Sequence, residues 1–288
     1  MPRQTTMKNT LLCVISVLCV PGCSSSPVAS DKAHPHASAA GGCEVVAIDD
    51  VEWAPLNPAR GDASPQAGDL WGDRTEEGAT GFLVRFAEGF SSPPHIHNVT
   101  YRGVVIQGLV HNDDPNAAPL WMPAGSFWTQ PAGEAHITAA DAPVNMAYIE
   151  IGGGPYLVQP TDDAFDTGER PINVHASNLV WADAPGGAEV SNLWEDAEDG
   201  SRGAFVKLPA GFAGELMSGG GGFRGVVIQG VIEMAASSGR DGTTLQPGGY
   251  FGSEAAETYR VRPAGQEAGI LYVRTTGDLV IGPAHAAR

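Results

Sequence analysis

A seven-residue segment, RGVVIQG, occurs twice in this chain, at residues 102–108 and again at 224–230. The match extends beyond this segment, because LWGDRTEEGATG at 70–81 corresponds to LWEDAEDGSRG at 193–203, and PAGSFW at 123–128 to PGGYFG at 247–252. Similarity that persists at one spacing with only short insertions predicts two tandem copies of a domain of about 115 residues.

Within each copy, short apolar segments alternate with turn-forming residues. GFLVRFAEGF at 81–90 and GAFVKLPAGF at 203–212 both alternate and then turn at glycine. The chain holds 38 glycines and 22 prolines, and no long amphipathic helical pattern is visible. Regularly spaced strands without intervening helices predict an all-β fold, either a barrel or a sandwich.

The N-terminus has the pattern of a secretion signal. MPRQTTMKN is basic, and the apolar segment TLLCVISVLCV that follows is too short to span a bilayer comfortably. VPGC at 20–23 resembles the lipobox of bacterial lipoproteins, which implies removal of residues 1–22 and lipid on Cys23. We expect a flexible tether at 23–42 and an acyl anchor in the cell envelope, at the periplasmic face or the outer membrane. Ordinary secretion with cleavage elsewhere is the alternative.

The charge balance limits the partners. The chain has 33 acidic and 16 basic residues, and this excess of negative charge argues against nucleic acid. We expect a small-molecule ligand and, through the lipid, a membrane; a homodimer is left open. Cys43 opens the apolar segment CEVVAI, which favours a small buried hydrophobic role for it over a reactive thiol.

Two segments of the first copy resemble the two motifs of the cupin superfamily. GFSSPPHIHNVTYRGVVIQG at 89–108 and GSFWTQPAGEAH at 125–136 match the cupin spacing at Gly89, His95, His97, Gly108, Gly125, Pro131, Gly133 and His136. The resemblance implies two tandem cupin-type β-barrels (double-stranded β-helix, or jelly roll), with an N-terminal domain at 43–165 and a C-terminal domain at 166–288. It is close to an uncharacterised family of bicupins, which supplies a fold but no activity.

Three histidines of the first copy are candidate metal ligands. His95 and His97 are two residues apart, so in a strand both point to the same face. His136 follows a Pro-x-Gly turn, on a strand expected to lie opposite. Three neutral imidazoles suit one divalent transition metal and leave coordination positions open. Iron is favoured, with zinc, manganese, nickel and copper as alternatives.

The first motif departs from the cupin pattern at one position. That pattern expects glutamate four residues after the second histidine, and this chain has Tyr101 there. Tyr101 is either a phenolate ligand or a hydroxyl beside a three-histidine site that holds water in the vacancy. The second copy, which lacks the histidines, has Phe223 at this place. An aromatic ring that persists there indicates a packing role, which favours the three-histidine site. Tyr101 and Glu134 are candidate catalytic residues, although no general base is assigned.

The second copy lacks all three histidines. Spacings of 122 and 124 residues align His95, His97 and His136 with Met217, Gly219 and Arg260. The C-terminal barrel is therefore predicted to be degenerate and free of metal. Arg102, Trp71 and Tyr148 persist in that copy, which indicates structural roles for them.

These observations predict a metal-binding bicupin lipoprotein with its site in the N-terminal barrel. Without a carboxylate ligand, a divalent ion keeps its double charge and favours a small anionic organic substrate. The site type resembles the three-histidine cupin dioxygenases that use iron, so an oxygenase is favoured over an isomerase or a hydrolase. The alternative is a non-catalytic envelope lipoprotein that binds or senses a small molecule or a metal.

Overall fold

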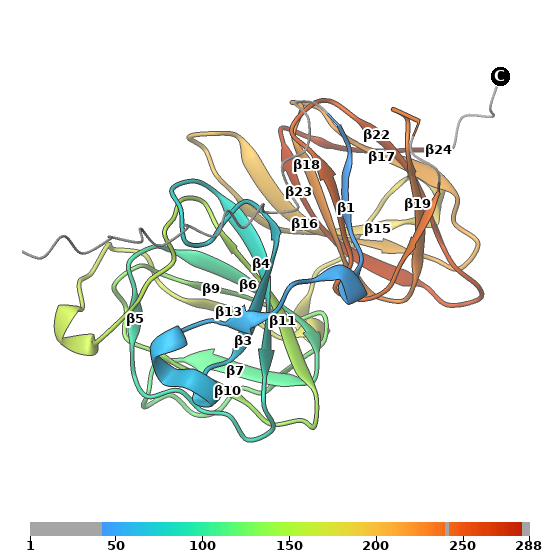
Figure 1. Ribbon diagram of the computed structural model, residues 1–288. Helices are drawn as coiled ribbons and strands as arrows, with labels where there is room; N and C mark the ends of the chain where they lie inside the picture. Colours follow the sequence, from blue (N-terminus) through green and yellow to red (C-terminus); the bar gives the residue numbers. More distant parts are fainter. Residues whose placement is uncertain (1–41, 240–241, 284–288) are drawn as a thin grey trace, which may run out of the picture. The chain divides into compact units, whose positions relative to one another are not determined.

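The computed structural model describes residues 42–239 and 242–283 (Figure 1). The predicted signal peptide, the tether and Cys23 lie outside these residues. Across the described residues, strands are joined by turns and five short 3-10 helices: η1 (Ile48–Asp50), η2 (Pro58–Ala63), η3 (Thr161–Asp163), η4 (Ala176–Asn178) and η5 (Pro185–Gly187). In these two ranges, no helix combines the length and apolar character needed to cross a membrane.

The N-terminal barrel contains one large sheet and two small ones, all antiparallel. In spatial order the large sheet is β13 (Ile172–Val174), β9 (Phe127–Gln130), β6 (Tyr101–Gln107), β11 (Asn145–Ile151), β4 (Thr80–Phe86), β3 (Gln66–Trp71) and β2 (Ala54–Pro55). The small sheets are β10 (Ile137–Ala140), β7 (Leu109–Asp113) and β8 (Met122–Pro123), and β12 (Val158–Gln159) with β5 (Ile96–His97).

The C-terminal barrel repeats this arrangement with two sheets. One is β1 (Glu44–Val46), β21 (Tyr250–Ser253), β18 (Phe223–Gln229), β23 (Gly269–Thr276), β16 (Ser201–Leu208), β15 (Glu189–Glu195) and β14 (Ala182–Asp183). The other is β20 (Thr243–Leu245), β19 (Ile232–Ala236), β22 (Thr258–Pro263), β17 (Gly214–Ser218) and β24 (Leu279–Pro283). The predicted all-β fold of two tandem cupin-type barrels is confirmed.

The two copies exchange their first strands. β1 begins the N-terminal copy but pairs with β21, and Figure 1 shows this blue strand among the orange and red strands of the second copy. β13 begins the second copy and pairs with β9 of the first. Each large sheet is thus completed by a strand of the other copy. At these two strands, the barrel to which a residue belongs differs from the domain that the predicted division at residue 165 assigns to it.

Both faces of the central strands are buried. On β4, Phe82 and Val84 belong to the interior of the N-terminal barrel, whereas Leu83 belongs to an apolar cluster built from both copies. Such double burial produces continuous apolar segments in place of simple alternation. Cys43, as predicted, is a buried apolar residue, 6% exposed, and it packs in the interior of the C-terminal barrel.

The repeated glycines are required by the fold. A Cβ on Gly103 would lie 2.1 Å from the Trp128 ring, so only glycine lets this ring pack against β6. Gly108 and its counterpart Gly230 both have positive φ, 83° and 74°, at the turn that follows the strand. The RGVVIQG segment is therefore retained in both copies for structural reasons.

A buried polar network joins the two copies. Glu150 is fully buried, and its carboxylate accepts hydrogen bonds from Tyr148, Tyr272 and Arg274 at 2.9, 3.2 and 3.1 Å. Trp71 and Trp194 donate to the same two tyrosine hydroxyls, each at 3.0 Å. Arg102 stacks on Trp194 at 3.7 Å. Trp71, Tyr148 and Arg102 thus have the structural roles that their persistence predicts.

Candidate metal centre

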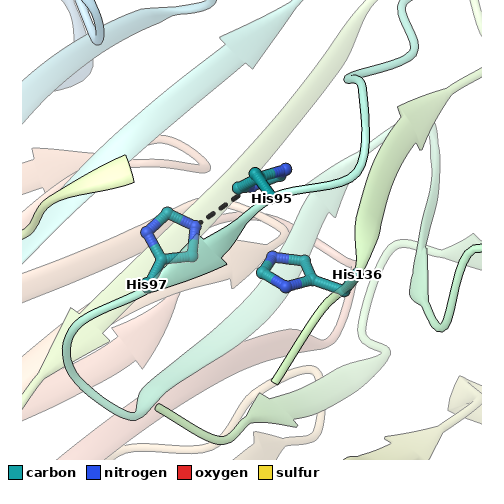
Figure 2. Close-up of side chains that lie close together, drawn as sticks. All are labelled: His95, His97 and His136. Atoms are coloured by element: carbon teal, nitrogen blue, oxygen red, sulfur yellow. Dashed lines mark hydrogen bonds between the residues drawn. The ribbon is translucent and has the colours of Figure 1, made fainter. Parts of the chain in front are cut away.

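The three predicted histidines meet inside the N-terminal barrel (Figure 2). His97 is on β5, His95 immediately precedes that strand, and His136 immediately precedes β10. His95 and His136 face each other in an isolated antiparallel bridge, with reciprocal main-chain hydrogen bonds of 3.0 Å. This bridge brings the two cupin motifs together at His95 and His136, which are about forty residues apart in sequence.

The spacing of the imidazoles fits a single metal ion. One ligand nitrogen from each ring lies within 4.8 Å of the others, and Nε2 of His95 is 3.2 Å from Nε2 of His97. Two nitrogens bound to one ion at ~2.1 Å would be separated by ~3.0–3.4 Å, depending on the coordination angle. His136 is 0%, His97 2% and His95 9% exposed, so the site is shielded from bulk water.

The second nitrogen of each ring is fixed by the backbone. The partners are carbonyl oxygens, which can only accept, so each Nδ1 must carry the proton and donate it. These bonds are His95 to Pro93 at 3.0 Å, His97 to Leu157 at 2.9 Å and His136 to Glu134 at 3.1 Å. All three Nε2 atoms are therefore unprotonated, and metal-binding histidines are oriented in this way.

The imidazoles are held neutral. Burial lowers the pKa of His95, and burial followed by the neighbouring histidines places the pKa of His97 well below its usual value. Burial and then the His95 charge lower the pKa of His136 to about 3. Two unprotonated nitrogens 3.2 Å apart repel each other unless a cation lies between them. The triad therefore fits a divalent metal on chemical grounds.

Tyr101 lies beside the triad. Its hydroxyl is 3.3 Å from Nε2 of His136 and donates to Oδ1 of Asn112 at 2.9 Å. Burial raises the pKa of Tyr101, so in the metal-free protein it is a neutral phenol. The Tyr101 hydroxyl thus lies beside the triad, and its catalytic role stays a prediction.

Tyr156 also lies at the site and was not predicted. Its ring stacks on His97 at a centroid distance of 4.3 Å, and its hydroxyl is 3.1 Å from Nε2 of that histidine. Val158 pairs with His97 as Leu279 pairs with Ser218, so the residue of the second copy that corresponds to Tyr156 is Gly277. Like the three histidines, Tyr156 has no equivalent in the second copy, and this shared absence is the signal that could have identified it.

Glu134 does not face the triad through its carboxylate. The side chain lines a separate hollow with Phe165, Asp166 and Arg170, and only the backbone carbonyl contacts His136. Burial raises the pKa of this carboxyl. The structure therefore gives Glu134 a positioning contact and does not bring its side chain together with the histidines.

A cavity of about 70 Å³ opens next to the triad. Its inner wall includes His95, His97, Tyr101, Trp128 and Tyr156. The remaining lining is mostly apolar, and among the described residues Arg60 is the one lining side chain with a permanent charge. The cavity can therefore accept a small, largely apolar molecule directly beside the predicted metal position.

The strand pairing corrects the alignment of the second copy. Ile137 pairs with Asp113, and Arg260 pairs with Ala235, the counterpart of Asp113 at the spacing of the RGVVIQG repeat. His136 therefore corresponds to Tyr259, whose partner on β17 is Leu216, as His95 is the partner of His136. The counterparts of His95, His97 and His136 are therefore Leu216, Ser218 and Tyr259, and the alignment with Met217, Gly219 and Arg260 is wrong by one residue. Leu216 and Tyr259 are both fully buried in the barrel interior, so apolar packing fills the space of the metal centre.

Comparison with solved structures supports the fold. A Nostoc punctiforme PCC 73102 protein, provisionally assigned as a dioxygenase, is 15% identical with a TM-score of 0.65, covering 85% of this chain and 87% of its own. Lactobacillus farciminis oxalate decarboxylase, solved with formate, is 12% identical with a TM-score of 0.57, covering 81% and 86%. A single-residue variant of Bacillus subtilis oxalate decarboxylase is 13% identical with a TM-score of 0.54, covering 84% and 79%. At these identities the likeness establishes the fold alone.

Sequence comparison adds the family. No curated protein matches the chain. The family described as a domain of unknown function, DUF4437, matches residues 44–281, which include both barrels and the histidine triad. Since this match spans most of the 288 residues, the chain belongs to the DUF4437 family.

Proposed function

We propose that the N-terminal barrel binds one divalent transition metal on His95, His97 and His136 and acts as a cupin-type dioxygenase on a small anionic organic molecule. The observation that supports this most is the common direction of three unprotonated Nε2 atoms, each fixed by a carbonyl on its Nδ1. Iron is the metal that we favour, because it supplies redox chemistry toward oxygen that zinc lacks.

The residues of the chain define how the site would work. Three histidines leave several coordination positions open for ligands. The hydroxyls of Tyr101 and Tyr156 lie 3.3 and 3.1 Å from ligand nitrogens, where they can hydrogen-bond to a molecule bound at those positions. Apolar walls exclude water around the substrate, which strengthens these contacts.

The lining of the cavity favours an oxygenase over a reaction that depends on a carboxylate base. Among the described residues, no carboxylate lines this cavity to act as a general base for hydrolysis or isomerisation. The envelope location, through lipid on Cys23, is part of the proposal and follows from the signal-like N-terminus.

The metal-binding half of the proposal is tested by substitution of each histidine. His95→Ala, His97→Ala and His136→Ala should each lower the bound metal from one ion per chain to below about a tenth after dialysis, because two imidazoles hold a divalent ion weakly. His111→Ala is the matched control, since His111 is also buried in this barrel but lies outside the triad. Elemental analysis measures the result. A triad variant that keeps a full equivalent of metal would refute the site.

The catalytic half is tested by oxygen consumption. Iron-loaded protein should take up oxygen with at least one member of a panel of carboxylates, phenols, thiols and diketones, and the His136→Ala variant should not. Full iron occupancy without any uptake would favour the alternative, a lipoprotein that binds or senses a small molecule without transforming it.

A further inference from the structure

Arg60 places a positive charge at the cavity of the metal centre. It lies on η2, whose neighbouring residues Leu56, Asn57, Ser64 and Pro65 also line the cavity. This segment precedes β3 and comes from a part of the sequence remote from both cupin motifs. Folding therefore brings this charge next to the site, although neither cupin motif contains Arg60.

The guanidinium of Arg60 has no acidic partner in the described part of the chain. None of the ion pairs or side-chain hydrogen bonds between described residues involves it. By contrast, Arg74 pairs with Asp69 at 2.7 Å. A cation left unpaired beside an apolar cavity, in a chain with a net charge of −17, is available to a ligand.

The remaining wall determines the shape of that ligand. Phe86, Phe90, Ile149 and Trp128 contribute apolar side chains to the lining of the cavity, beside His95 and His97. About 70 Å³ of space corresponds to roughly five water molecules, at ~15 Å³ for each. The cavity thus suits a short branched chain or a single ring.

We infer that the substrate of this site is a small monocarboxylate whose carboxylate pairs with Arg60 and whose apolar body packs against Phe86, Phe90 and Ile149. This inference rests on the proposed function and gives that site its substrate class. A guanidinium matches a carboxylate with two parallel hydrogen bonds. Arg60 is the one permanently charged side chain in the described lining, so its end of the cavity specifies a single carboxylate.

Matched neutral and anionic probes test the inference. The probe pairs are benzoate with benzamide and isovalerate with isovaleramide, titrated against zinc-loaded protein while the fluorescence of Trp128 and the other tryptophans is followed. Wild-type protein should bind each carboxylate roughly tenfold more tightly than its amide, as expected for one charge-assisted pair. Arg60→Gln should abolish this preference, and Arg262→Gln, which removes an exposed arginine on the other barrel, should preserve it.

The controls separate the inference from the proposed function. Arg60→Gln should keep one zinc per chain, because Arg60 contacts none of the metal-binding nitrogens. A preference for carboxylate that survives in Arg60→Gln would overturn the inference, since the metal alone would then hold the anion. Failure of wild-type, zinc-loaded protein to bind either carboxylate would also overturn it. Loss of zinc binding in the triad variants tests the metal site independently of both results.

Discussion

At the scale of single residues, the triad is oriented by backbone carbonyls instead of carboxylates. Carboxylate partners would bring negative charge close to the metal, whereas the carbonyls of Pro93, Leu157 and Glu134 fix the rings without adding charge. With neutral ligands and neutral orienting groups, the double charge of the ion is compensated only by what binds it. The site is thereby suited to an anion.

The depressed histidine pKa values predict how stability depends on pH in the metal-free protein. An exposed histidine titrates near ~6.5. Because the folded-state pKa of His97 and His136 lies lower, the unfolded chain takes up more protons as pH falls below ~6.5, and stability declines toward pH 3. Chemical denaturation of chelator-treated protein between pH 7 and pH 4 measures this decline.

A variant isolates the histidine contribution to that decline. Replacement of both residues, as His97→Asn and His136→Asn together, should give a shallower loss of stability over the same pH range. Equal slopes for the variant and the wild-type protein would show that other groups, such as carboxylates, account for the entire pH dependence.

At the scale of elements, the segment that follows β11 completes the site. It carries Tyr156, which stacks on His97, and Leu157, whose carbonyl accepts from that histidine. Two hydrogen bonds from Asn98 hold the segment in position. Its side chain donates to the Pro155 carbonyl and accepts from the Leu157 amide, both at 2.9 Å. The segment is thus tied to the residue next to a metal ligand.

Asn98→Ala is expected to weaken metal binding without removing a ligand. Loss of both hydrogen bonds frees the Leu157 carbonyl from its position, and such indirect partners typically contribute about 10–100-fold in metal affinity. Competition with a chromogenic chelator measures the affinity. Asn116→Ala, in the turn after β7, is the matched control and should leave the affinity unchanged. An Asn98→Ala affinity within twofold of wild type would contradict this role.

The sequence alone was sufficient to predict the features that belong to the repeat or to a motif, and it was insufficient to predict the others. The shared RGVVIQG strand and the two histidine motifs predicted both barrels and the three histidines that the fold brings together. Alignment of the two copies could not decide whether Leu216 or Met217 corresponds to His95. The two residues are adjacent on β17, so their side chains point to opposite faces, and an error of one residue selects the wrong face. Arg60 lies on η2 and Tyr156 in the segment after β11, and neither belongs to a cupin motif or to the RGVVIQG repeat, so the motifs alone do not place them at the site.

At the scale of the whole molecule, the two copies differ in charge at their shared centre. Glu150 and Arg274 occupy corresponding positions, two residues after Tyr148 and Tyr272, and pair with each other at 3.1 Å. Two identical copies would place like charges together here, at considerable cost in a buried site. The divergence of this one position therefore makes the two halves complementary.

Glu150→Ala is expected to destabilise the protein by about 3–5 kcal/mol, because it leaves Arg274 and two tyrosine hydroxyls without their buried partner. Equilibrium denaturation in urea measures the change. Asp166→Ala removes an ion pair whose two side chains are 69% and 65% exposed, and it should have little effect. Equal stability of the two variants would show that the central pair contributes no more than a surface contact.

The exchanged first strands have a consequence for the integrity of the molecule. Each half carries a piece of the other's large sheet, β1 in one direction and β13 in the other. Cleavage of the link between the barrels by a protease would therefore not separate them. The two fragments would stay associated until the strand that each contributes to the other's sheet dissociates.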